Sequence, residues 1–110
     1  MRIALDFDAT YTLDHELWDQ FIRMAELRGV QVILATYRHE VHDAHPLIDS
    51  LKERIPVYFT DGKAKKPFLE ALGIVVDVWI DDRPMTILED SAWGQDSPEL
   101  AAWREANAAA

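Results

Sequence analysis

Short apolar runs alternate with helix-like segments along this chain, and that alternation constrains the fold more than any other feature. Strand-like runs lie at residues 2–7, 30–35, 57–59 and 74–80. Helical patterns follow them at residues 14–28, 42–54, 67–72 and 85–93, and Asp96 with Glu99 resembles the start of a last helix. Buried strands separated by helices predict a three-layer α/β/α, doubly wound parallel sheet. We expect one domain over residues 1–110, with a helical segment from about residue 85 to the end.

The helical patterns also predict which side chains face the core. In the first helix, Leu17, Phe21 and either Met24 or Ala25 recur on one face, and Asp14 is the expected cap. The same reasoning adds these core residues: Leu47, Ile48 and Leu51 in the second helix and Trp79 in the last strand.

Composition narrows the classes of function. With 49% apolar residues, the chain has enough apolar material for a buried core. It contains no cysteine, which excludes disulfides, thiolate metal sites and cysteine nucleophiles. No apolar run approaches the roughly 18 residues of a membrane span. The formal net charge of −9 disfavours long nucleic acids. We therefore expect a cytoplasmic protein with no membrane partner. A nucleic acid would bind only if one of its ends were the substrate.

Acidic, hydroxyl and amine side chains cluster at or near the ends of the predicted strands. They are Asp6, Asp8, Thr36, Lys63, Lys65, Lys66, Asp81 and Asp82. In a parallel sheet these strand ends share one edge, where ligands bind. Carboxylates crowded there repel one another unless a cation lies between them, and their oxygens suit Mg²⁺. The sequence therefore predicts a magnesium site whose ligands are Asp6, Asp8, Asp81 and Asp82.

These residue types are suited to phosphoryl transfer. An aspartate can attack phosphorus and form an aspartyl-phosphate. A second acid can protonate the leaving group and later activate water. Magnesium offsets the repulsion between carboxylate and phosphate, while a lysine and a threonine hold the phosphoryl oxygens. The pattern therefore favours a phosphomonoester hydrolase.

The order of these residues resembles the four motifs of the haloacid dehalogenase-like superfamily, over about residues 2–84. The segment Asp6-Phe7-Asp8-Ala9-Thr10 matches the first motif and Thr36 the second. A lysine among residues 63–66 matches the third, and Asp81-Asp82 matches the fourth. The resemblance implies that Asp6 is the nucleophile and Asp8 the general acid/base, which is the phosphatase pattern within that superfamily.

Two details of the match leave questions open. The first motif usually has glycine where this chain has Ala9, and a left-handed backbone there would cost alanine about 1 kcal/mol. Three lysines compete for the third motif. Lys66 precedes Pro67, which biases its backbone away from helix, so Lys65 and then Lys63 are favoured as the catalytic lysine.

The spacing of the motifs predicts an open site. One helix and one strand fill the chain between Thr10 and Thr36, and the same holds between Thr36 and Lys65. No cap domain fits there. The resemblance then implies a large phosphorylated substrate, or a lid supplied by a second copy in a homodimer. Thr10, Thr36 and Arg38 are candidate substrate contacts, although Thr10 could instead brace its loop and Arg38 could lie at the surface.

Other functions fit parts of the pattern. A receiver-like signalling domain shares the sheet, acids and magnesium, but its phosphorylated aspartate follows the third strand, where this chain has Thr60 and Asp61. A Toprim-type nuclease needs the acidic motifs in the opposite order. A catalytically inactive phosphate-binding relative would keep the motifs without turnover. His39, His42 and His45 could also bind a transition metal if they shared a helical face.

Overall fold

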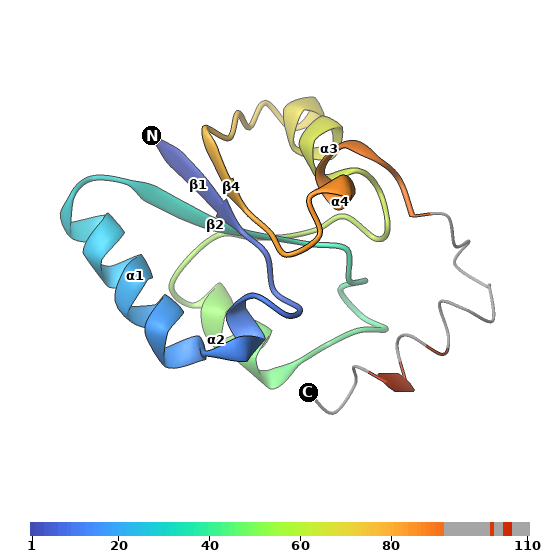
Figure 1. The fold of residues 1–110 in the computed structure, drawn as a ribbon, viewed down its shortest axis with the longest axis horizontal. Coiled ribbons are helices and arrows are strands. Elements are labelled where there is room, and N and C mark those ends of the chain that lie inside the picture. The colour runs from blue at the N-terminus through green and yellow to red at the C-terminus, as the bar shows by residue number, and fades with distance from the viewer. Residues whose placement is uncertain (92–101, 103–104, 107–110) are drawn as a thin grey trace.

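A computed structural model shows an α/β fold on a four-stranded, all-parallel sheet (Figure 1). The structure describes residues 1–91, 102 and 105–106. Its elements are β1 (Arg2–Leu5), the short 3-10 helix η1 (Tyr11–Leu13), α1 (His15–Leu27), β2 (Gln31–Thr36), α2 (Pro46–Lys52), β3 (Val57–Phe59), α3 (Lys65–Ala71), β4 (Val78–Ile80) and α4 (Met85–Leu88). The strand order is β3-β2-β1-β4, so the chain moves outward from β1 to β3 and then returns to the other side of β1. That reversal places the topological switch point between β1 and β4.

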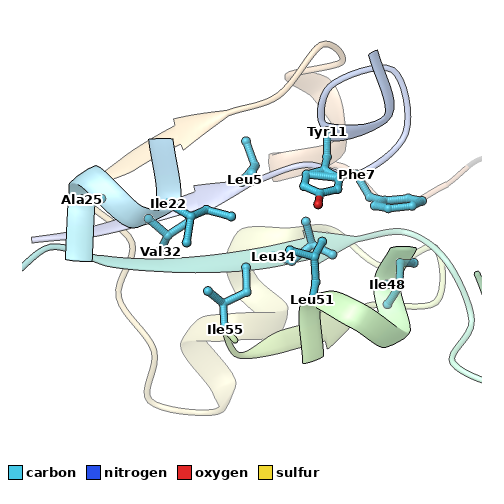
Figure 2. Packing of buried hydrophobic residues seen from close by; sticks show 10 residues of the cluster. All are labelled: Leu5, Phe7, Tyr11, Ile22, Ala25, Val32, Leu34, Ile48, Leu51 and Ile55. Atoms are coloured by element: carbon cyan, nitrogen blue, oxygen red, sulfur yellow. The ribbon is translucent and has the colours of Figure 1, made fainter. Parts of the chain in front are cut away.

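Alternate residues of the central strands face opposite sides of the sheet and pack against different helices. One core cluster joins the sheet to α1 and α2 (Figure 2). It contains Leu5, Phe7, Tyr11, Ile22, Ala25, Val32, Leu34, Ile48, Leu51 and Ile55. A second cluster joins the other face to α3, and its buried members are Ala4, Ile33, Ala35 and Leu69. Helices thus cover both faces of the sheet, as the strand–helix alternation predicts.

The first helix has the predicted cap, and only part of its predicted face meets the core. The Asp14 carboxylate accepts a hydrogen bond from the backbone N–H of Leu17. Leu17 is 55% exposed, so the prediction that it faces the core is wrong, whereas Phe21 packs on the core as predicted. Of the alternatives Met24 and Ala25, Met24 is 59% exposed and Ala25 is buried. The inward residues are Trp18, Phe21, Ile22 and Ala25. This face buries the larger side chains, which is why it outcompetes the neighbouring one.

Several element boundaries also differ from the predicted ones. α2 begins at Pro46 rather than near residue 42, because proline suits the first turn of a helix and disrupts its interior. α3 begins two residues before Pro67, and β4 covers only Val78–Ile80. α4 ends at Leu88, short of residue 93. Trp79 is half-buried against the second cluster. The helix expected after Asp96 lies outside the described residues.

Among the residues that the structure describes, no helix combines the length and the apolar character needed to cross a membrane.

Candidate active site

Three carboxylates meet at the switch point between β1 and β4. Asp6 follows β1, and Asp81 and Asp82 follow β4. The two strands pair in parallel, with Leu5 opposite Ile80, and the N–H of Asp6 extends the pairing to the Ile80 carbonyl at 2.9 Å. One oxygen from each of the three carboxylates lies within 4.8 Å of the others. Strand register therefore brings together acids that are some 75 positions apart in the sequence.

Lys65 is the cation of this cluster. Its Nζ lies 2.8 Å from Oδ1 of Asp6 and 2.6 Å from Oδ2 of Asp81. The side chain is 2% exposed, and Nζ also lies 5.7 Å from the centre of the Tyr37 ring. Lys63 is exposed, as is Lys66. Of the three lysines that compete for this role in the sequence, Lys65 alone reaches the acids among the described contacts.

The electrostatics of the cluster leave negative charge uncompensated. The cluster holds three carboxylates, of which Asp6 and Asp81 contact the ammonium of Lys65 and Asp82 is exposed, so its formal charge with all three acids ionised is −2. Burial raises the pKa of Asp6 from its ordinary 3.8 to about 7, and the charge of Lys65 opposes this rise. A surplus of two negative charges on an all-oxygen donor set fits a hard divalent cation.

Two threonine hydroxyls lie within hydrogen-bond distance of the carboxylates. Oγ1 of Thr10 lies 3.2 Å from Oδ2 of Asp6 and 3.5 Å from Oδ1 of Asp82. Oγ1 of Thr86 lies 3.2 Å from Oδ2 of Asp81. A hydroxyl donates one hydrogen bond at a time, so Thr10 can bond only one of its two acids at once. Thr10 therefore braces the acids in this structure.

Asp8 does not join the cluster; it binds Arg38. The guanidinium donates from Nε to Oδ2 of Asp8 at 2.9 Å and from Nη2 to Oδ1 at 2.7 Å. Its Nη1 donates to the backbone carbonyl of Asp43 at 3.0 Å, and its Cζ lies 5.1 Å from the centre of the Phe7 ring. Arg38 is only 2% exposed, so it is not a surface residue. The carboxylate of Asp8, expected to be a metal ligand, is held away from the three-acid group.

Thr36 ends β2 at the same edge of the sheet. Its side chain is buried, and its Oγ1 accepts a hydrogen bond from the backbone N–H of Arg38 at 3.2 Å. Its carbonyl accepts a hydrogen bond from the N–H of Thr60 at 2.8 Å. In this structure Thr36 therefore fixes the turn that carries Arg38 toward Asp8.

Ala9, which stands where the first motif usually has glycine, has the left-handed backbone considered in the sequence analysis. Ala9 has a φ of 58°, in the left-handed region that glycine adopts at no steric cost. Its N–H donates to Oγ1 of Thr12 at 3.0 Å. The bend separates the buried carboxylate of Asp6 from that of Asp8.

Two of the three histidines, His39 and His45, bind the backbone of their own segment, and the ring of His42 lies 4.4 Å from that of His39. Nδ1 of His39 accepts hydrogen bonds from the N–H groups of Val41 and His42, and Nδ1 of His45 accepts one from Leu47 at the start of α2. Within the described part of the chain, the acidic cluster is the only group of three or more side chains placed to hold a metal. The histidines therefore do not form a shared metal site there.

The structure shows two contacts near the site that the sequence did not predict. Thr86 was not predicted, although a hydroxyl one helical turn beyond the acids of β4 is a usable signal. Tyr37 hydroxyl donates to the carbonyl of Glu89, and burial raises its pKa to about 12. This bond ties the loop after β2 to the segment after α4.

Comparisons with known proteins identify no relative of this chain. No family model, no curated protein and no solved structure matches the chain. The resemblance to the haloacid dehalogenase-like superfamily therefore rests on the motifs and on their placement at the strand ends.

Proposed function

We propose that this protein is a magnesium-dependent phosphomonoester hydrolase of the haloacid dehalogenase type, with Asp6 as its nucleophile. The observation that carries the proposal is the meeting of Asp6, Asp81, Asp82 and Lys65 at the topological switch point. Ligands of open α/β sheets bind in this place. A solvated turn would leave such acids apart, whereas here strand pairing and a buried lysine hold them together.

The acidic cluster would hold the magnesium ion. Oxygens of Asp6, Asp81 and Asp82 supply the hard donors that Mg²⁺ prefers, and the formal charge of −2 matches its charge. When bound, Mg²⁺ offsets the repulsion between the Asp6 carboxylate and the phosphate group that it attacks.

The reaction would proceed in two transfers. A carboxylate oxygen of Asp6 forms a bond to phosphorus, and the bond from phosphorus to the ester oxygen breaks. Asp8, which must first take up a proton and release one of its two hydrogen bonds from Arg38, gives that proton to the ester oxygen. The product is an alcohol and an aspartyl-phosphate on Asp6. Asp8, now a carboxylate, takes a proton from water as the water oxygen bonds to phosphorus. The bond from phosphorus to Asp6 breaks, inorganic phosphate leaves and both acids return to their starting states.

Lys65 and Arg38 would have different parts in this scheme. Lys65 contacts Asp6 directly, so its ammonium lies beside the place where the phosphoryl group would be attached. Arg38 uses three of its nitrogens on Asp8 and on the Asp43 carbonyl. We assign Arg38 to the positioning of Asp8 rather than to phosphate.

The substrate would be a bulky phosphoester. Each connection between consecutive strands contains a single α-helix and no additional sheet or helical bundle. Nothing in these connections provides a lid, so small substrates would gain few contacts beyond the phosphate. A larger substrate could contribute binding energy from remote contacts.

The test is a screen of phosphomonoesters of increasing size, with Mg²⁺ and with a chelator. Asp6→Asn should abolish turnover because an amide is a poor nucleophile, and Asp8→Asn should slow it by about 10²–10⁴-fold through lost proton transfer. Asp49→Asn is the matched control, since Asp49 is an exposed carboxylate whose ion pair with Lys52 lies on the surface of α2. Turnover by Asp6→Asn at the rate of the unmodified protein would refute the mechanism.

A further inference from the structure

Helix α1 carries a second apolar stripe on the side away from the core. Leu17, Met24 and Leu27 are 55%, 59% and 79% exposed, and Leu13, just before the helix, is 77% exposed. Gln20, also exposed, completes the row. Within α1, positions 17, 20, 24 and 27 alternate in steps of three and four, which is the spacing of a coiled-coil seam, and Leu13 lies before them at the end of η1.

This stripe differs from scattered apolar residues on a surface. Single exposed leucines are normal in soluble proteins and need no explanation. A regular seam of large apolar side chains along one helix is the arrangement by which helices associate. The core-facing residues of α1, such as Ile22 and Ala25, lie on a different face, so the stripe is not required for the packing of the helix on the sheet.

Charges beside the stripe indicate which helix would pack there. Glu16 and Arg23 lie seven positions apart on the same flank, and both are exposed. If a second α1 packs in the same direction, each Arg23 lies beside the copy's Arg28, which brings like charges together, and each Glu16 lies beside the copy's uncharged Phe21. If the second helix runs the opposite way, Glu16 of each copy meets Arg23 of the other. A two-fold axis then forms this pair twice.

We propose that the exposed stripe of α1 binds the α1 stripe of a second copy of this chain in an antiparallel pair. In the register that matches the charges, Leu17 packs beside the second copy's Gln20, and Met24 lies toward the end of the second copy's η1, where Leu13 is exposed. One helix of 13 residues gives a small contact, so the dimer forms reversibly and depends on protein concentration. The proposed active site lies beyond the N-terminal end of α1, so the two sites lie at opposite ends of the helix pair.

The first experiment measures the dimer dissociation constant of the full chain by sedimentation equilibrium. Glu16→Arg or Arg23→Glu alone replaces two attractive pairs by two repulsive ones and should weaken the dimer by about tenfold. The double variant Glu16→Arg with Arg23→Glu restores both pairs and should return the constant to near its original value. Glu70→Arg, a charge reversal at an exposed position on α3, is the control and should leave it unchanged.

A second variant tests the interface through its apolar contacts, in case the charged pairs change the dissociation constant too little to measure. Gln20→Leu replaces the polar residue at the centre of the stripe and should tighten the dimer at least tenfold, while circular dichroism confirms unchanged helix content. A chain that stays monomeric up to millimolar concentration would overturn the proposal. A dimer that the double charge swap fails to restore would overturn it as well.

Discussion

The guanidinium of Arg38 binds both oxygens of the Asp8 carboxylate, at 2.9 Å from Nε and 2.7 Å from Nη2. This bidentate pair joins the loop after β1 to the loop after β2, and the arginine is 2% exposed. Two parallel hydrogen bonds fix the plane of a carboxylate as well as its position. If Asp8 transfers the proton, its orientation toward the reacting oxygen depends on Arg38.

Arg38→Lys should lower kcat by about 10–100-fold and leave KM within a few-fold. Lysine keeps the charge but cannot present two donors in one plane, and a small displacement of a catalytic group can cost about 100-fold. Steady-state kinetics on the best substrate of the screen measures both constants. Arg54→Lys is the control, because it makes the same chemical change at a more exposed arginine that pairs with Asp19 away from the site. A rise in KM with kcat unchanged would show that Arg38 contacts the substrate instead.

Lys65→Met should abolish turnover and lower the free energy of unfolding by about 3 kcal/mol in metal-free buffer. The change leaves the carboxylates of Asp6 and Asp81 buried without the ammonium between them, and breaking a buried ion pair is strongly destabilising. Urea denaturation measures the stability, and the phosphatase assay measures turnover. Lys63→Met makes the same chemical change at an exposed residue and should alter neither. If Lys65→Met and Lys63→Met changed turnover and stability equally, the role proposed for Lys65 would be wrong.

The order of strands and helices could be predicted because it depends on local patterns. Apolar runs mark buried strands, and their carboxyl ends mark the edge where Asp6 and Asp81 meet. Which strands are neighbours is a long-range property, so the sequence alone did not show that β1 pairs with β4. The predicted metal set included Asp8 because it follows the first strand two residues after Asp6, and the sequence did not show that its carboxylate binds Arg38.

The face of α1 shows a second limit of sequence patterns. Two apolar stripes share this helix, one with Ile22 and one with Leu17 and Met24. The periodicity of apolar residues reports both and does not say which one meets the sheet. The packing of Ile22 against the core decides it, and only the structure contains that information.

Ala9→Gly should raise the free energy of unfolding by roughly 0.5 kcal/mol, the balance of the left-handed strain of alanine and the unfolded-chain entropy of glycine. Ala9 has a φ of 58°, where a Cβ atom is strained and glycine is not, although glycine also gains entropy in the unfolded chain. Thermal or urea unfolding measures the difference. Ala71→Gly, at the end of α3, is the opposite control and should destabilise by about 0.5–1 kcal/mol because its backbone is helical. Destabilisation by Ala9→Gly would contradict the left-handed conformation.

Magnesium should raise the melting temperature of the protein in the absence of any substrate. A ligand that binds only the folded state adds about 2.7 kcal/mol at a concentration 100 times its dissociation constant. For a domain of this size each kcal/mol corresponds to roughly 4–8 °C. Differential scanning fluorimetry, with chelated protein as the reference, measures the shift.

Asp81→Asn makes the magnesium prediction specific to the acidic cluster. It removes one of the three carboxylates within 4.8 Å of one another, so the variant should lose most of the magnesium-dependent shift. Asp49→Asn removes an exposed carboxylate on α2 and should keep the full shift. Because this readout needs no turnover, it separates metal binding from catalysis. If the protein binds Mg²⁺ through Asp81 but hydrolyses no phosphoester, the metal site is confirmed and the proposed phosphatase activity is wrong. A shift of equal size in Asp81→Asn and in the unmodified protein would place the metal elsewhere.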